Sequence, residues 1–140
     1  MLHIDSFTRA YIEAALWSST DEDGDPLDAN YSATDLAPQT LATMVEDCAK
    51  FQVELASIIA TARQKLDSQG ELSAADWSDW EGSVSDLELA GHDFWLTRNG
   101  HGTGFWDGDW PDDVGDALTE ASKRYREVDL YVGDDGKLYS

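Results

Sequence analysis

The sequence predicts a mainly α-helical protein, a single-domain bundle of four to five helices with a small C-terminal β-hairpin. Apolar residues recur at helical spacing through most of the chain, and the longest such stripe covers about seven turns from Pro38. Only the last segment changes to short runs of β-branched and aromatic residues around a glycine turn. Because the pattern is not interrupted by an internal repeat, a linker or a segment of different amino-acid composition, residues 1–140 are expected to form one domain.

The first predicted helix runs from Ser6, which we expect to be its N-cap, to Trp17. The next segment, residues 18–31, is rich in Asp, Gly, Pro and Asn and predicts a loop. A long helix then begins at Pro38, whose fixed φ suits the first helical position. The apolar stripe of this helix consists of Leu41, Met44, Val45, Cys48, Phe51, Leu55, Ile58, Ile59, Ala62 and Leu66.

Three shorter helices are expected in the second half of the chain. We predict them at residues 74–80, at residues 84–98 with an exit at Asn99-Gly100, and at residues 112–126. The inward residues of the middle one are Val84, Leu87, Gly91, Phe94 and Trp95. The chain then closes with a hairpin over residues 128–139, built around a Gly-Asp-Asp-Gly turn.

The charge of the chain restricts its partners. It carries 29 acidic and 9 basic residues, a net charge of −20, whereas solubility needs a magnitude of roughly 2–8. Apolar content of 41% with 11% aromatic residues separates it from disordered acidic tails. Such a charge argues against direct binding to nucleic acid or to an anionic membrane, since Lys and Arg supply that affinity. The natural partner is a basic protein, above all one that binds nucleic acid.

The acidic residues are clustered rather than dispersed. No basic residue lies between Lys65 and Arg98 or between Arg98 and Lys123, and another acidic run spans Asp21 to Asp28. Carboxylates one turn apart on a helix are about 5–6 Å apart, so runs of them can imitate a ladder of phosphates. The predicted partner-binding residues are Asp76, Asp79, Glu81, Asp86, Asp109, Asp112, Asp113 and Asp116, with Trp77 and Trp80 as aromatic anchors. The alternatives are a solvated acidic face without a single partner, and tryptophans that only anchor a helix to the core.

A second candidate lies in the glycine-rich stretch that follows the middle helix. His92, Arg98, Asn99 and His101 form a possible ligand loop, and with Asp93 they offer an acid–base group. The glycines follow a helix rather than a strand, which excludes a P-loop or a dinucleotide fingerprint. On a helix, His92 and Asp93 point about 100° apart, so they do not naturally pair. The alternative is a structural clamp, and we expect no catalytic residues and no enzyme activity.

No cofactor or metal site is predicted. The run from Asp21 to Asp25 lacks the glycine and glutamate spacing of an EF-hand, and the three histidines lack zinc-ligand spacing. Cys48 is the only cysteine, which excludes an intrachain disulfide, and its place on the apolar stripe predicts a core residue. Neither a signal peptide nor a membrane span is present in the sequence, so we expect a cytoplasmic protein.

Two segments carry a resemblance to a known family. These are His92-Asp-Phe-Trp-Leu-Thr-Arg-Asn-Gly-His-Gly-Thr-Gly-Phe-Trp-Asp107 and Val128-Asp-Leu-Tyr-Val-Gly-Asp-Asp-Gly-Lys-Leu-Tyr139. They resemble small acidic bacteriophage and mobile-element proteins of unassigned function. The resemblance implies a phage accessory protein in a bacterial host, and such proteins include DNA mimics that inhibit host defence proteins. The other hypotheses are a small ligand-binding protein or enzyme, and a virion or assembly component.

Overall fold

The computed structural model describes residues 4–69, 84–100 and 112–140 of the chain. Its elements are the helices α1 (Ser6–Ser18), α2 (Pro38–Gln69), α4 (Val84–Arg98) and α5 (Asp112–Lys123), the 3-10 turns η1 (Leu27–Ala29) and η2 (Ala33–Asp35), and the strands β1 (Tyr131–Val132) and β2 (Leu138–Tyr139). The prediction of a mainly helical protein with a small C-terminal hairpin is therefore confirmed. The predicted helix at residues 74–80 lies outside the described residues.

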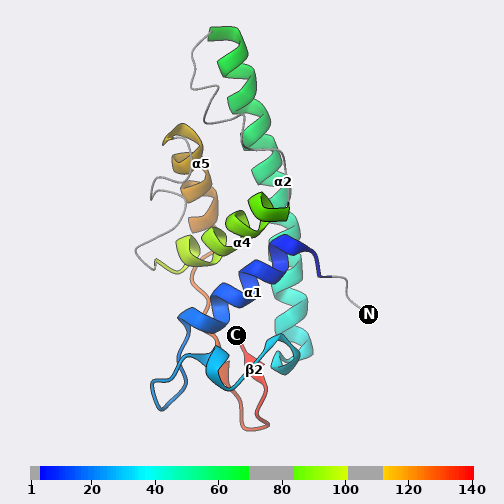
Figure 1. Ribbon diagram of the computed structural model, residues 1–140, viewed down its shortest axis with the longest axis vertical. Helices are drawn as coiled ribbons and strands as arrows, with labels where there is room; N and C mark the ends of the chain where they lie inside the picture. Colours follow the sequence, from blue (N-terminus) through cyan, green and yellow to red (C-terminus); the bar gives the residue numbers. More distant parts are fainter. Residues whose placement is uncertain (1–3, 70–83, 101–111) are drawn as a thin grey trace.

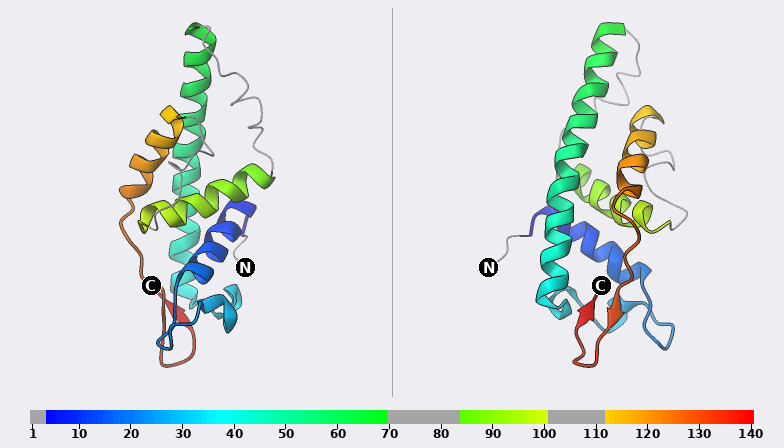
Figure 2. Two further views of the ribbon diagram at one scale, coloured as in Figure 1. Left: turned by 60° about the vertical axis from the view of Figure 1, so that its left-hand side comes forward. Right: turned by 180° about the vertical axis from the view of Figure 1, so that it is seen from behind.

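Helix α2 forms the long axis of the molecule (Figure 1). Helices α1 and α4 pack closely on each other and cross α2 obliquely, while α5 packs against α2 and α4 (Figures 1 and 2). The hairpin and the two 3-10 turns lie at the end where α2 begins (Figure 2). Within the described residues, none of the helices combines the length and the apolarity that crossing a membrane would require.

Helix α1 begins one residue earlier than the sequence suggested. Asp5, not Ser6, is the N-cap: its backbone is extended, and its carboxylate Oδ1 accepts the N–H of Thr8 at 2.8 Å. A carboxylate in this position also interacts favourably with the positive end of the helix dipole. Ser6 therefore lies inside the first turn of the helix.

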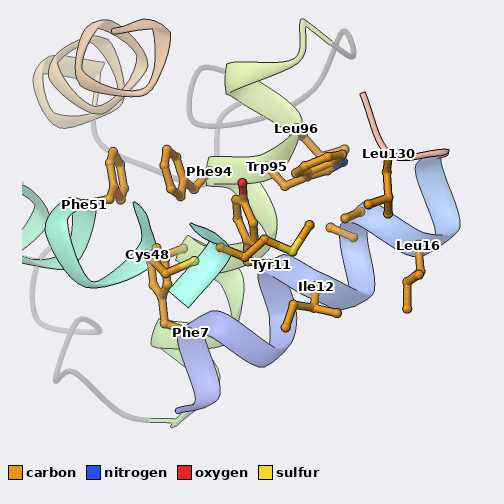
Figure 3. Packing of buried hydrophobic residues seen from close by; sticks show 14 of the residues in the cluster. Phe7, Tyr11, Ile12, Leu16, Cys48, Phe51, Phe94, Trp95, Leu96 and Leu130 are labelled. Carbon is orange, nitrogen blue, oxygen red and sulfur yellow. The ribbon is translucent and has the colours of Figure 1, made fainter. Parts of the chain in front are cut away.

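The core is built around aromatic rings from three helices. Phe51 of α2 and Phe94 of α4 lie face to face with ring centroids 4.0 Å apart (Figure 3). Tyr11 of α1 meets the Trp95 ring edge-on at 5.3 Å. Cys48 is fully buried beside these rings, as predicted, and burial raises the pKa of its thiol. Such stacked and edge-to-face contacts add to the free energy gained by burying the rings.

Helix α4 is more deeply buried than its pattern predicted. The sequence assigned it one inward face, and Gly91, Phe94 and Trp95 of that face are buried as expected. In addition, α4 buries residues that the pattern left outside, namely Asp93, Leu96, Thr97 and Arg98. Helix α4 packs against α1 and α5, and its Phe94 and Arg98 contact Phe51 and Asp47 of α2.

Helix α5 ends at Lys123, three residues before the predicted end at Arg126. Arg126 has a φ of 65°, in the left-handed region that non-glycine residues rarely adopt. Beyond the helix, the carbonyl oxygens of Tyr125 and Arg126 accept hydrogen bonds from Arg98. We infer that Arg98 turns this segment away from helical geometry.

The structure confirms the predicted terminal hairpin, with strands of two residues each that are shorter than the predicted ones. Tyr131 pairs with Tyr139 and Val132 with Leu138 in antiparallel register. Leu138 is fully buried, and its carbonyl oxygen accepts the N–H of Ala37 at 2.9 Å. The segment before α2 thus flanks β2, which makes β1 the outer strand of the pair.

Candidate functional site

Six of the ten predicted partner-binding residues fall outside the part of the chain that the structure describes. Asp76, Trp77, Asp79, Trp80, Glu81 and Asp109 lie outside the described residues. Asp86 lies in the first turn of α4, and Asp112 and Asp113 open α5. Asp116, one turn after Asp112 along α5, is exposed. The structure thus brings Asp112, Asp113 and Asp116 together on one helix, and the proposed binding role of the set remains a prediction.

Of the predicted ligand loop, Arg98 lies in the core. It is only 5% exposed, and its Nη1 donates to the Tyr11 hydroxyl and to Asp47 Oδ2, each at 3.0 Å. Its Nε donates to the Arg126 carbonyl at 2.8 Å, and its Nη2 donates to the Tyr125 carbonyl. The guanidinium also lies over the rings of Phe94 and Tyr125. These contacts place the cation at the junction of α1, α2, α4 and the segment after α5.

The other described members of that loop point to different partners. Asn99 donates from Nδ2 to the Trp95 carbonyl at 2.9 Å and accepts the N–H of Val128 at 2.7 Å. His92 stacks on Trp17 with ring centroids 5.5 Å apart, and its Nδ1 lies 3.8 Å from an Asp93 oxygen. His101 lies outside the described residues. In the described part of the chain, Arg98 and Asn99 thus hold α4 to the chain after α5, whereas His92 faces α1.

A different group of charged residues is brought together where α2 begins. In the loop before η1, Asp21 Oδ1 accepts the N–H groups of Asp23 and Asp25 at 2.9 and 3.0 Å. The Leu27 N–H donates to the Ser19 carbonyl, and the Leu27 side chain is fully buried. The loop is therefore closed at its base and anchored in the core, so its acidic side chains are presented to solvent from an ordered backbone.

The C-terminal hairpin lies at the same end of the molecule (Figures 1 and 2). It is held there by the contact of Leu138 with residues 36 and 37. We call residues 19–36 and 128–140 together the acidic end. Its acidic residues are Asp21, Glu22, Asp23, Asp25, Asp28, Asp35, Asp129, Asp134 and Asp135, all exposed or half-buried, and Lys137 is its only basic residue.

The carboxylates of the acidic end are not neutralised by Lys or Arg in the described part of the chain. The ion pairs between described acidic residues and Lys or Arg join Lys50 to Glu46, Arg98 to Asp47 and Arg124 to Glu54, all away from this end. Asp21, Asp35 and Asp135 instead accept hydrogen bonds from nearby backbone N–H groups. Concentrated, unneutralised charge produces a field that attracts cationic surfaces over a Debye length.

Within the hairpin, Asp135 gives a pH-dependent prediction. Its carboxylate accepts the Tyr139 hydroxyl at 2.7 Å and the Lys137 N–H at 3.0 Å, which together hold the pKa of Asp135 below its usual range. Because the pKa of Asp135 is lower in the folded state than in the unfolded state, its carboxylate stabilises the fold at pH values above the unfolded-state pKa of about 3.9. This stabilisation disappears as the pH falls through the folded-state pKa. The Tyr139 ring signals in NMR spectra should therefore stay constant from neutral pH and shift only below the usual aspartate range.

The variant Asp135→Asn tests this prediction. At neutral pH, the Tyr139 signals of this variant should differ from those of the wild type. At a pH low enough to protonate Asp135 in the wild type, the signals of the two proteins should become similar. Asp134→Asn is the matched control, because no described residue hydrogen-bonds to the Asp134 side chain, and it should leave the Tyr139 signals unchanged. A wild-type Asp135 that titrates at or above the usual aspartate pKa would contradict the prediction.

Among the described residues, no three His, Cys, Asp or Glu side chains are grouped so that they could hold a metal ion. A comparison of the chain with protein-family models, curated proteins and solved structures found no match.

Proposed function

We propose that this protein is a non-enzymatic inhibitor that binds the basic, nucleic-acid-binding surface of another protein. The observation that supports the proposal is the acidic end, where exposed carboxylates gather from two distant segments with a single lysine among them. A surface that binds phosphates through Lys and Arg would bind such a carboxylate array by the same attraction, in competition with nucleic acid.

The physical form of the protein suits this role. A cluster of like charges needs a scaffold, because its self-repulsion opposes compaction. Here the loop of residues 19–26 is closed by backbone hydrogen bonds, and the hairpin is fixed to the start of α2 through Leu138. The backbone that carries the carboxylates is therefore held in place before a partner arrives, which reduces the entropy lost on binding.

In its biological setting, we propose that the partner is a host protein acting on DNA or RNA. The likeness of the His92–Asp107 stretch to small acidic phage proteins supports a phage accessory protein acting in the bacterial cytoplasm against a defence protein. On this proposal the protein is a DNA mimic, and its binding weakens as salt concentration rises.

The experiment is capture from a bacterial lysate, followed by competition between the captured protein and duplex DNA. The acidic-end variant carries Glu22→Gln, Asp23→Asn, Asp28→Asn and Asp134→Asn. The control variant carries Glu13→Gln, Glu88→Gln, Glu120→Gln and Glu127→Gln, exposed positions elsewhere that give the same change in net charge. We expect the first variant to lose affinity at least about tenfold and the second to remain close to the wild type.

Two results would overturn the proposal. One is recovery of no nucleic-acid-binding protein at low or moderate salt. The other is an equal loss of affinity in both variants, which would assign binding to net charge rather than to the acidic end.

A further inference from the structure

The outer strand of the hairpin has an unpaired edge. Gly133 donates to the Lys137 carbonyl, so residues 133 and 137 form a hydrogen-bonded pair. Hydrogen-bonded and non-hydrogen-bonded pairs alternate along an antiparallel ladder, so Val132 and Leu138 form a non-hydrogen-bonded pair. The N–H and C=O of Val132 therefore point away from β2, and no described residue forms a hydrogen bond with them. On the other side of the hairpin, Ala37 already occupies the outward carbonyl of Leu138.

An exposed aromatic surface lies beside this edge. Tyr131 is 54% exposed and stacks on Tyr139, with ring centroids 6.0 Å apart. The Tyr139 ring is fixed by its hydrogen bond to Asp135 and lies directly over Gly133, where a side chain would collide with it. The Tyr131 ring thus has a rigid neighbour on one side and solvent on the other. A tyrosine face of this kind attracts Lys and Arg side chains.

The charge around this edge determines what can bind there. Asp129 and Asp134 are exposed on either side of β1, and the loop with Glu22 and Asp23 lies at the same end of the molecule. A cationic segment would be attracted by these carboxylates, whereas a neutral or acidic segment would gain nothing from them or be repelled. Two copies of the chain would bring their negative charges together at this edge, and the repulsion between these charges disfavours pairing of the copies.

We propose that β1 binds an extended, Lys- or Arg-containing segment of the partner by strand addition. The outward N–H and C=O of Val132 pair with the backbone of the segment, and Tyr131 contacts a cationic side chain on its exposed face. Asp129 and Asp134 lie near the remaining positive charges. This inference rests on the proposed function, because it specifies how the acidic end would hold a basic protein partner.

The test uses a short peptide in which lysine and valine alternate, titrated into the ¹⁵N-labelled full chain at low salt. We expect the Val132 amide to shift and its hydrogen exchange to slow about tenfold or more on binding. The control peptide has the same sequence with a methyl group on every backbone nitrogen, because methylation along one edge would leave the other edge free to pair. It keeps every charge but cannot complete the ladder, so it should bind about tenfold more weakly.

A second test changes the backbone donor of the protein instead of the peptide. Val132→Pro removes the outward N–H and leaves the hydrogen bonds between β1 and β2 in place, since Tyr131 and Gly133 make those. Val132→Thr keeps the N–H and is the matched control. We expect the proline variant alone to lose peptide binding, with a circular dichroism spectrum and melting curve showing that it remains folded.

The possible results separate this inference from the proposed function. If the peptide binds with shifts confined to the loop of residues 19–28, or equally well when N-methylated, strand addition is wrong while attraction by the acidic end stands. If the peptide does not bind at all, strand addition is also wrong, and the lysate competition decides on the proposed function independently.

Discussion

Replacing Arg98 by methionine is expected to lower the free energy of unfolding by about 3–5 kcal/mol, the range found when one partner of a buried ion pair is removed. Domains of ordinary size have a total stability of about 5–15 kcal/mol. The variant would therefore be marginally folded at room temperature. Urea denaturation followed by circular dichroism measures the loss directly.

The size of this effect follows from what the guanidinium leaves behind. Without it, the half-buried Asp47 carboxylate loses its cationic partner, and the carbonyls of Tyr125 and Arg126 lose their donors. Each unsatisfied buried polar group costs about 1–3 kcal/mol. The methionine side chain fills much of the same volume, so the measured loss reports on the polar contacts rather than on a cavity.

Two further variants sharpen this test. Arg9→Met removes an exposed arginine on α1 whose guanidinium forms no hydrogen bond or ion pair with the described residues, and it should change stability by less than about 0.5 kcal/mol. Arg98→Lys keeps the charge, but its three donors lie on one nitrogen, whereas Arg98 makes four hydrogen bonds from three nitrogens. Its stability should therefore fall between those of the wild type and Arg98→Met. A methionine variant as stable as the Arg9→Met control would show that the cluster contributes little to the fold.

Substituting Gly91 is expected to have the second largest effect. A Cβ atom at this position would overlap the backbone carbonyl of Phe7, where α4 crosses α1. Because the obstacle is backbone, no side-chain rotation relieves it, and the two helices must move apart. Gly91→Ala should therefore destabilise the protein by about 1–3 kcal/mol despite the higher helix propensity of alanine, and Gly91→Val should destabilise it more.

The control for Gly91 is a glycine with a different constraint. Gly136 has a φ of 79° and no neighbouring atom in the way of a Cβ, so Gly136→Ala costs only backbone strain. We expect its effect to be confined to the hairpin, with the near-ultraviolet circular dichroism of the core unchanged, whereas Gly91→Ala should alter that signal. A Gly91→Ala variant more stable than the wild type would mean that α1 and α4 separate without cost.

The sequence predicts the parts of this fold that depend on neighbouring residues. The periodic stripe from Leu41 to Leu55 and the turn at residues 133–136 are local signals. The structure confirms the helix and the hairpin that they predict. The early end of α5 has no local signal: the carbonyl oxygens of Tyr125 and Arg126 accept hydrogen bonds from Arg98, which is far away in the sequence. An arginine at a helix terminus is typical of a solvated residue, and no local pattern distinguishes one that is surrounded by carbonyl oxygens.

For the candidate site, sequence reasoning identified half of the acidic end. The run from Asp21 to Asp28 was visible as a cluster, but Asp129 appeared as a strand residue and Asp134 and Asp135 as ordinary turn residues of a hairpin. What joins them is the bridge between Leu36 and Leu138, a contact between two leucines with nothing distinctive in their local sequence. A cluster of charges within one segment can be recognised in a sequence. Whether two such segments lie side by side in the folded protein depends on long-range contacts of this kind.

The pairing of α1 with α4 also bears on how the chain is made. Phe7 is synthesised early, but Gly91, against which it packs, is translated only after more than half of the chain. Until then, the apolar face of α1 has no final partner in the nascent polypeptide, and long-range contacts of this kind slow folding. The same negative charge that would attract a cationic target keeps unfinished chains apart, and thereby opposes their aggregation on the ribosome.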